Sequence, residues 1–568
     1  MVIALDLLWV GGRLLAVRGH LVRARSEVAT ARREASQGHL TAALAAARAA
    51  QHDAAATGGL AGDPVWAVNR HLPVLGSTLV GVQGLAAVAG GLARDVVPPL
   101  SAAAADLRAE NLRLPGGGGI DVTRLRSAAN ALDAATVALS RSRAEATALP
   151  ASTFLGVASS ARADLLHQLD DLQGQLRGAR LVTRLAPDML GARGPRRYFL
   201  ALQNTAEARG TGGIIGAYGV VVADRGRLAL VAAGGDSQLM DFPAPVTTVS
   251  PDFARRWGAF GAAAIWRNSN LSPHYPWTTE VISALYAKRF FEPLDGVVTL
   301  DPGAAGYVLE AAGPARLPDG TSVRGQDLTE FVEKTLYERY ADRQQRQNVL
   351  TQVQRAIFSR LIGPGGDPGP LLAALGRAAG EGRLLVGSTH PAEQRLLAGT
   401  AVAGVLPNEP GPYAALVLTN SSGDKLDYYL DRDVSWSAGP CGGPRRTAVV
   451  RATLTNTAPP SGLPGYVDGH ATIGRVVPTS YLKEYVSVYG SVDATLVNAT
   501  LDGQPVVLVQ DRERGHPVAS LYVTLPPGGG RHTVEVTWDE PSTGPVHPLH
   551  LPPLVRDPVT HTAVPACD

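Results

Sequence analysis

The first 190 residues carry a helical pattern that limits what this part of the chain can fold into. Apolar residues recur every three to four positions through runs such as "LVRARSEVATARREASQGHLTAALAAARAA", in which alanine dominates. Alanine has the highest helix propensity, and this period places apolar side chains on one face of a helix. The expected helices span about 18–61, 77–112, 120–148 and 157–185. Because an Ala-rich helix has no chemistry of its own, we expect a helical stalk over 18–190.

The period changes from helical to extended at "GPRRYFLALQN". We expect a strand at about 197–203, another at 294–301 in "LDGVVTLD", and a long helix over 326–361. Strands that alternate with helices are typical of an α/β domain, here predicted over 191–362. A shorter α/β extension and connector is expected to follow over 363–412.

The last quarter of the chain has a pattern typical of β-strands. Alternating β-branched runs such as "TAVVRATLTNTA", "VDATLVNATL" and "RHTVEVTW" are separated by Gly, Pro, Asn and Asp. Short strands with regular turn signals indicate a β-sandwich of immunoglobulin-like type over 413–568. The whole chain is therefore expected to be a multidomain α+β protein.

Composition excludes two classes of protein. Hydrophobic residues make up 45% and charged residues 18% of the 568-residue chain, so it folds rather than staying disordered. The formal net charge is +2 and aromatic residues are 5%, so neither an electrostatic footprint nor stacking platforms for nucleic acid are evident. We expect no nucleic-acid partner.

The N-terminal run "MVIALDLLWVGGRLLAV" bears on location. Its 17 residues are apolar except for Asp6 and Arg13, and a membrane span needs about 20. We interpret residues 1–17 as a truncated single-span signal anchor, with an amphipathic first helix as the alternative. The basic residues that follow it, among them Arg18 and Arg23, oppose an exported body by the positive-inside rule.

Cysteine usage also bears on location. Cys441 and Cys567 are the only two cysteines, and both lie in the last quarter of the chain. One disulfide closing a C-terminal domain in an oxidising compartment accounts for this, and two unrelated buried thiols are the alternative.

The loop "NTAEARGTGGIIG" at 204–216 resembles a phosphate cradle at first sight. Its glycines miss the dinucleotide spacing G-x-G-x-x-G, and no Gly-Lys-Ser/Thr follows. Known cradles also lead into a helix, whereas "IIGAYGVVVAD" predicts a strand. Arg209 then has two interpretations: its guanidinium binds phosphate oxygens, or it pairs with Glu207 to brace the turn.

A second polar cluster lies in "YADRQQRQNVL". Helical spacing puts Asp342, Arg343, Arg346 and Gln347 close to one another, where they could bind a pyrophosphate and a divalent ion. A solvated helix face with ion pairs is the alternative. Two loop residues beside the sheet, Asp236 in "GGDSQLMD" and Asn270 in "WRNSNLSPHYP", are further candidates.

Several ordered motifs carry a family resemblance. A helical stalk followed by "LQNTAEARGTGGIIGAYG", "WRNSNLSPHYP", "LDGVVTLDP" and "TLTNTAPPSGLPGYV" resembles the bacterial envelope proteins of domain-of-unknown-function family 4012. The resemblance covers nearly the whole chain. It implies an extracytoplasmic cell-envelope location on the cell membrane and no established activity.

A more distant likeness is to the LytR-CpsA-Psr phosphotransferases, which transfer polyprenyl-pyrophosphate-linked glycopolymers. It implies pyrophosphate-binding arginines and metal-binding carboxylates. The positions that match are Arg209, Asp236, Asp342, Arg343, Arg346 and Gln347. Thr211 stands where that family has an aspartate, and Gly235 stands where it has an arginine.

The resemblances imply a membrane-anchored envelope protein that binds or transfers a polyprenyl-(pyro)phosphate-linked glycopolymer or cell-wall polymer. Arg209, Arg343 and Arg346 would neutralise pyrophosphate, with Gln347 and Asn270 beside them. Asp236 and Asp342 would be the catalytic carboxylates and hold Mg²⁺. The alternative is a non-enzymatic scaffold of the envelope. Loss of the carboxylate at Thr211 and of the arginine at Gly235 weighs against catalysis.

Overall fold

The computed structural model describes scattered residues between 16 and 56, and then residues 76–115, 117–151, 157–363, 368–469 and 478–567. They form a multidomain α+β protein with two compact units. The first unit is Met1–Pro195 with Asp224–Arg227, and the second is Arg196–Ala223 with Leu228–Asp568. Nearly all of the predicted anchor at 1–17 and most of the predicted helix at 18–61 lie outside the described residues.

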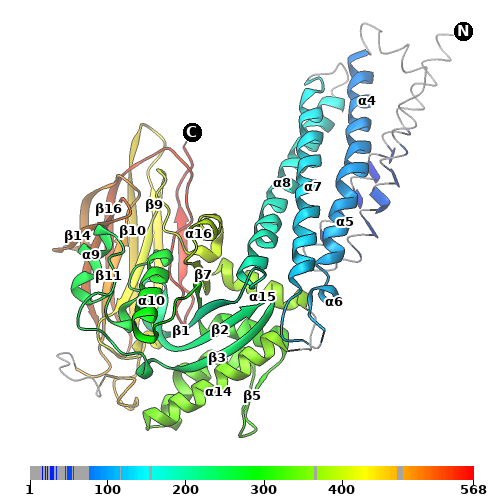
Figure 1. Ribbon diagram of the computed structural model, residues 1–568. Helices are drawn as coiled ribbons and strands as arrows, with labels where there is room; N and C mark the ends of the chain where they lie inside the picture. The colour runs from blue at the N-terminus through cyan, green and yellow to red at the C-terminus, as the bar shows by residue number, and fades with distance from the viewer. Residues whose placement is uncertain are drawn as a thin grey trace, which may run out of the picture. The chain divides into compact units, whose positions relative to one another are not determined.

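The first unit is helical (Figure 1). Its helices from residue 76 onward are α4 (Gly76–Gly91), α5 (Val97–Asp106), α6 (Ala109–Leu112), α7 (Val122–Ala148) and α8 (Val157–Met189), with a π-helical turn at Leu92–Val96. Asp121 caps α7 by accepting a hydrogen bond from the backbone N–H of Thr123 at 2.8 Å. Leu132 and Leu139 of α7 share a buried core with Leu169 of α8. The expected helices at 120–148 and 157–185 are therefore present.

One helical segment of the described chain, Leu79–Asp106, is long and apolar enough to cross a membrane by length and composition. It comprises most of α4, the π-helical turn and α5. Val88, Val96 and Ala103 of this segment contribute to the core shared with α7 and α8. The segment thus combines the composition of a membrane span with the buried face of a bundle helix.

The second unit begins with a five-stranded sheet of order β3-β2-β1-β4-β7. The strands are β1 (Arg196–Arg209), β2 (Gly212–Asp224), β3 (Arg227–Gly235), β4 (Gly296–Leu300) and β7 (Leu384–Ser388). β1 pairs parallel to β4 and antiparallel to β2. Successive strand side chains point to opposite faces: Val297 of β4 enters a core with α10 (Tyr275–Phe290), and Leu300 packs on a core with α11 (Pro302–Ala312).

Both turns of the β1–β2–β3 meander are tight. Gly210 and Thr211 connect β1 to β2, so the expected loop at 204–216 is mostly strand, with a register shift between Asn204 and Ala208. Arg225 and Gly226 connect β2 to β3 with φ of 49° and 82°. Positive φ at both positions suits a two-residue hairpin turn, as the sequence predicts for Gly226.

The predicted helix at 326–361 is wrong as a single element. The chain forms α12 (Leu328–Glu330), a π-helical turn at Phe331–Thr335, α13 (Leu336–Arg339) and then α14 (Arg343–Ile362). Tyr340 is extended, with φ −121° and ψ 102°, and Asp342 caps the new helix. The remaining helices of this part are α9 (Pro251–Trp257), α15 (Pro368–Gly380) and α16 (Pro391–Leu397).

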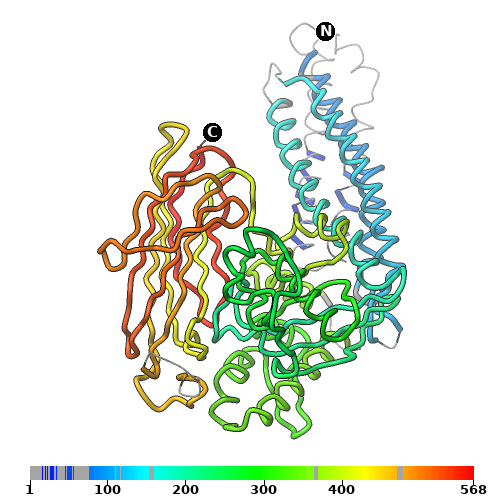
Figure 2. The backbone as a smooth tube through the Cα atoms, turned by 60° about the vertical axis from the view of Figure 1, so that its left-hand side comes forward, coloured from blue at the N-terminus to red at the C-terminus, as the bar shows by residue number. Residues whose placement is uncertain are grey.

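The last part of the second unit contains two further sheets, of order β13-β12-β16-β10-β9-β17 and β14-β15-β11-β8. Their strands are β8 (Ala415–Asn420), β9 (Leu430–Ala438), β10 (Arg445–Asn456), β11 (Leu482–Tyr489), β12 (Thr495–Leu501), β13 (Gln504–Pro505), β14 (Val509–Glu513), β15 (His516–Leu525), β16 (Gly530–Pro541) and β17 (Val559–Ala563). Figure 2 shows them as a block of extended segments, yellow to red. Both sheets contribute to one core that holds Trp436 and Trp538.

The α/β part and the two-sheet part have no clean boundary between them. Ala208, at the end of β1, is buried in the core of the two sheets. Tyr485 of β11 is in turn buried in the core of the α/β part. The end of β1, which carries the predicted site loop, therefore lies inside a contact between two parts of one compact unit.

Candidate functional site

Arg209 is the last residue of β1, and its guanidinium is bonded to the protein. Nη1 donates to the carbonyl oxygens of Ala208 at 2.8 Å and Asn420 at 3.2 Å, and Nε donates to that of Arg267 at 3.2 Å. Nη2 lies 3.4 Å from Glu207 Oε1, and the residue is 7% exposed. We expected this guanidinium to face a ligand. It is instead buried and hydrogen-bonded to the protein, because the two-sheet part covers the end of β1.

The glycines around Arg209 allow close backbone contacts. A Cβ at Gly210 would lie 2.1 Å from the carbonyl oxygen of Leu271, and one at Gly213 would lie 2.1 Å from that of Asn204. Real Cβ atoms do not approach backbone this closely, so the glycine run serves dense packing rather than access for a phosphate.

Asn270 and Thr211 brace the same turn. Asn270 Nδ2 donates to Thr211 Oγ1 and to the carbonyl oxygen of Gly213, both at 2.9 Å, and Asn270 is fully buried. Gln203 Nε2 also donates to Thr211 Oγ1, at 2.6 Å. The predicted ligand contact by Asn270 is therefore replaced by an internal one. Thr211 accepts two hydrogen bonds at the position where a metal carboxylate was expected.

A second group of predicted residues does converge. Asp236 follows β3 in a short 3₁₀ turn, and Arg343 and Gln347 lie one turn apart on α14. Arg343 Nη2 and Gln347 Nε2 both donate to Asp236 Oδ1, at 3.2 and 3.0 Å. Ser237 Oγ donates to Gln347 Oε1 at 2.7 Å. We call these four residues the Asp236 cluster; the side chain of Arg343 is 54% exposed.

The absence of a side chain at Gly235 leaves room for the Gln347 carboxamide in the Asp236 cluster. A Cβ at position 235 would lie 2.5 Å from the carboxamide of Gln347. A larger residue at this position would displace the Gln347 carboxamide from Asp236. The arginine that the phosphotransferase likeness implies here is therefore incompatible with the observed Gln347 geometry.

The side chains of Asp342 and Arg346 form hydrogen bonds with backbone groups at the start of α14. Asp342 Oδ1 accepts from the backbone N–H of Gln345 at 2.8 Å, as an N-cap. Arg346 Nη1 donates to the carbonyl oxygens of Tyr340 and Ala341 at 2.6 and 2.7 Å, and Arg346 is 6% exposed. Among the described residues, no group of three or more His, Cys, Asp or Glu could hold a metal ion.

Arg346 takes part in a stack that the sequence did not suggest. The rings of Tyr337 and Tyr466 are stacked, with centroids 5.6 Å apart and planes at 8°. The Arg346 guanidinium lies 5.2 Å from both ring centroids, and Lys425 Nζ lies 5.2 and 5.6 Å from them. Cations at this range are attracted by the ring faces. No local pattern joins Tyr337 to Tyr466, which are far apart in the chain.

Lys425 connects this stack to β1. Its Nζ lies 3.5 Å from Glu207 Oε2, and Lys425 is only 3% exposed. Burial alone would lower the pKa of Lys425, but Tyr337 and Glu207 outweigh burial and raise that pKa above its ordinary value. Lys425 therefore stays charged inside the protein.

Three buried carboxyl groups complete the contact between the α/β part and the two-sheet part. Glu333 Oε1 accepts from the backbone N–H and the hydroxyl of Thr205 at 2.5 and 2.9 Å, and burial raises the pKa of Glu333 to about 7. Asp427 Oδ2 accepts from the backbone N–H of Ala208 at 2.8 Å, and burial raises its pKa to about 6. Glu484 beside it is fully buried, and burial together with Asp427 raises the pKa of Glu484 well above its usual value.

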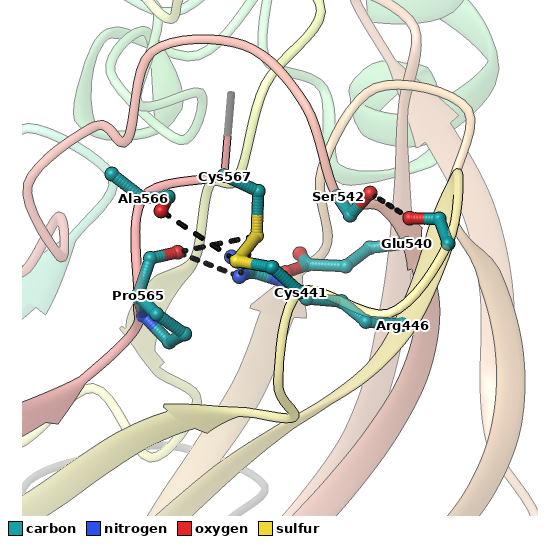
Figure 3. Close-up of a disulfide and its surroundings, with 8 residues drawn as sticks. Cys441, Arg446, Glu540, Ser542, Pro565, Ala566 and Cys567 are labelled. Atoms are coloured by element: carbon teal, nitrogen blue, oxygen red, sulfur yellow. Dashed lines mark hydrogen bonds and ion pairs between the residues drawn. A yellow bond between two sulfur atoms is a disulfide. The ribbon is translucent and has the colours of Figure 1, made fainter.

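The predicted cysteine pair forms a disulfide, drawn in Figure 3. Cys441 precedes β10 and Cys567 lies near the end of the chain, with Cα atoms 5.5 Å apart. Beside it, Arg446 donates to Glu540 Oε1 at 3.1 Å and to the carbonyl oxygen of Pro565 at 2.6 Å. The disulfide and Arg446 together hold the C-terminal segment against the six-stranded sheet.

Comparison with known proteins gives a limited result. No curated protein matches the chain. The Lin1025 protein from Listeria innocua is 11% identical, with 39% of this chain and 85% of that chain covered and a TM-score of 0.20. The transcriptional regulator yvhJ from Bacillus subtilis is also 11% identical, with coverages of 38% and 84% and a TM-score of 0.20. At this TM-score neither likeness carries an argument.

One family model matches, over residues 193–337, and its description is "Protein of unknown function (DUF4012)". The matched segment contains the Arg209 turn, Asn270 and Asp236. The resemblance drawn from the sequence motifs is thus confirmed for residues 193–337, which match the model of the DUF4012 family.

Proposed function

We propose that this protein is a membrane-associated, extracytoplasmic component of the cell envelope whose second unit acts as a non-catalytic scaffold. The observation that carries the proposal is the bonding of Arg209, whose guanidinium donates to three backbone carbonyl oxygens. To bind a phosphate, this guanidinium would first have to leave those acceptors buried and unpaired, which costs about 1–3 kcal/mol for each group. One of the three acceptors, the carbonyl oxygen of Asn420, belongs to the two-sheet part, so the guanidinium instead joins the α/β part to that part.

Two observations support the location. The disulfide between Cys441 and Cys567 suits an oxidising compartment outside the cytoplasm. The apolar segment Leu79–Asp106 suits association of the helical unit with a membrane.

A second candidate function is binding of a polyprenyl-pyrophosphate-linked glycopolymer at the Asp236 cluster. The half-exposed Arg343 guanidinium favours it, because a planar fork of donors fits phosphate oxygens. Asp236 would hold Mg²⁺ together with phosphate oxygens of the ligand, as Mg²⁺ sites commonly use few carboxylates. Asp342 is used as a helix cap and contributes no ligand in this arrangement.

Two fold assignments for the second unit are also part of this proposal. We infer a LytR-CpsA-Psr-like fold for the α/β part from the motif order, and an immunoglobulin-like sandwich for the two sheets from their shared core. Superposing an experimental structure of the second unit on members of each fold class tests both assignments.

The full-length protein distinguishes the two functions in a binding and turnover experiment. Farnesyl pyrophosphate with Mg²⁺ is titrated into the wild type, Arg343→Ala and the control Arg339→Ala, in which an exposed arginine of α13 is removed. The scaffold proposal expects no binding difference among the three proteins and no release of phosphate. Binding that only Arg343→Ala abolishes would establish the second candidate, and phosphate release by the wild type would overturn the scaffold proposal.

A further inference from the structure

A groove of about 620 Å³ lies within the second unit, away from the Arg209 turn and the Asp236 cluster. Its sides come from α9 of the α/β part, from the β14–β15 hairpin and from the first residues of β12. Small-molecule sites commonly measure about 300–1,000 Å³ and lie where domains meet. The groove therefore has the size and the position of a ligand site.

The polar side of the groove is held in place by its own contacts. Arg255 Nε donates to Asp511 Oδ1 at 2.7 Å, and Arg255 Nη2 donates to Asp252 Oδ1 at 2.9 Å and to the carbonyl oxygen of Arg512 at 3.0 Å. Asp252 Oδ2 also accepts from the backbone N–H of Arg514 at 3.1 Å. These bonds fix α9 to the β14–β15 hairpin, so a ligand meets a preorganised wall.

The charges of this wall balance. Asp252, Arg255, Asp511 and Arg512 contribute two positive and two negative charges, and Arg255 is paired with both carboxylates. Because the net charge of the wall is zero, the wall offers no overall attraction to a strongly charged ligand. A neutral ligand with several hydroxyl groups can instead add hydrogen bonds to the donors and lone pairs that remain.

The opposite side of the groove is apolar, with Leu496, Pro517 and Val518. Trp538 also lines the groove and is 2% exposed. The site thus combines a hydrogen-bonded polar wall with an apolar surface.

We propose that this groove binds a short neutral oligosaccharide. A sugar ring offers hydroxyl groups at its edge for the Arg and Asp side chains and for Gln510, and C–H groups on its faces for the apolar side. The site differs from both candidate sites above and does not depend on the scaffold role.

The test uses the full-length protein and three neutral trisaccharides, cellotriose, maltotriose and N,N′,N″-triacetylchitotriose, with binding measured by calorimetry. Thr495→Trp fills the groove from the exposed start of β12, and Gln510→Ala removes an exposed amide from its wall. Asn498→Trp is the matched control, on the same strand and exposed but outside the lining. Inorganic pyrophosphate and the dipeptide Ala-Ala serve as charged probes.

We expect at least one trisaccharide to bind, with affinity reduced about tenfold or more by Thr495→Trp and by Gln510→Ala and unchanged by Asn498→Trp. The proposal is overturned if none of the three binds, or if Thr495→Trp binds as the wild type does. Stronger binding of pyrophosphate or Ala-Ala that Thr495→Trp abolishes would assign the groove to a charged ligand instead.

Discussion

Asp427 accepts a hydrogen bond from the backbone N–H of Ala208 at 2.8 Å, across 219 residues of sequence. Ala208 immediately precedes Arg209, so the turn predicted to hold a ligand is fastened by a carboxylate of the two-sheet part. Near this bond, the buried cations Lys425 and Arg209 lie beside the buried carboxylate of Glu207, so their charges are paired inside the protein.

Replacing Lys425 with methionine removes a buried cation. Glu207 then loses its ion pair at 3.5 Å, and Tyr337 and Tyr466 lose a cation near their ring faces. Breaking one partner of a buried pair typically lowers the free energy of unfolding by about 3–5 kcal/mol. Denaturant unfolding of Lys425→Met should show such a loss, whereas exposed Lys288→Met should stay within about 0.5 kcal/mol of the wild type. Equal stability of the two variants would contradict this pairing of buried charges.

Glu333 should make stability depend on pH. Its pKa is raised by burial from 4.5 to about 7 in the folded protein. Between these two pH values the folded state binds more protons than the unfolded state. The free energy of unfolding of the wild type is therefore raised by protonated Glu333 below about pH 4.5, and this contribution is lost as the pH rises through 7. The difference in unfolding free energy between the wild type and Glu333→Gln should therefore fall by about 3 kcal/mol across this window.

The matched control is Glu330→Gln, one turn earlier, whose side chain is 62% exposed. This variant removes an exposed carboxyl from the same helical stretch, and the pH dependence of Glu333→Gln should exceed that of the control. Equal pH dependence of the two variants would mean that the Glu333 carboxyl is not held protonated by burial.

Two glycines near the β1–β2 turn, Gly213 and Gly216, should differ in how well they tolerate substitution by alanine. Gly213→Ala places a Cβ 2.1 Å from the carbonyl oxygen of Asn204, whereas at Gly216 the nearest atom is the Asn204 Cβ at 3.5 Å. Because backbone must move only in the first case, we expect Gly213→Ala to destabilise by about 1–3 kcal/mol or more and Gly216→Ala to be nearly neutral. Thermal unfolding of both variants measures this, and the reverse order would show that the turn is not closely packed.

The disulfide should stabilise the two-sheet part. Cys441→Ser with Cys567→Ser opens a loop of 126 residues, and loss of a native disulfide commonly lowers stability by about 2–5 kcal/mol. Calorimetric unfolding of the double variant checks the size of the effect. Thiol labelling of the protein in intact cells checks the compartment, since freely reactive Cys441 and Cys567 would contradict an oxidising one.

Local patterns were sufficient for much of the fold. The helices at 120–148 and 157–185 follow from apolar spacing along one chain segment, and Gly226 marks a hairpin through its own backbone freedom. The strand expected at 294–301 appears as β4 over Gly296–Leu300 for the same reason. Helical spacing also placed Arg343 and Gln347 on one helix face, and both of them contact Asp236.

The surroundings of Arg209 were not predictable in this way. One of its carbonyl acceptors belongs to Asn420, 211 residues further along the chain. Arg346 was assigned to a ligand because helical spacing aligns it near Arg343, but two carbonyl groups at the preceding break take its donors. Spacing identifies which residues share a face, whereas the partner that covers the face depends on tertiary contacts.

The contact between the two parts has a practical consequence for dissecting the molecule. The family segment 193–337 supplies Glu207, Arg209 and Glu333, while Lys425, Asn420 and Asp427 lie beyond its end. A recombinant fragment cut at these bounds would present buried charges and the open end of β1 to water. Expression work and genetic truncations should therefore keep Arg196–Cys567 intact, since a shorter piece would report the loss of folding rather than the loss of a function.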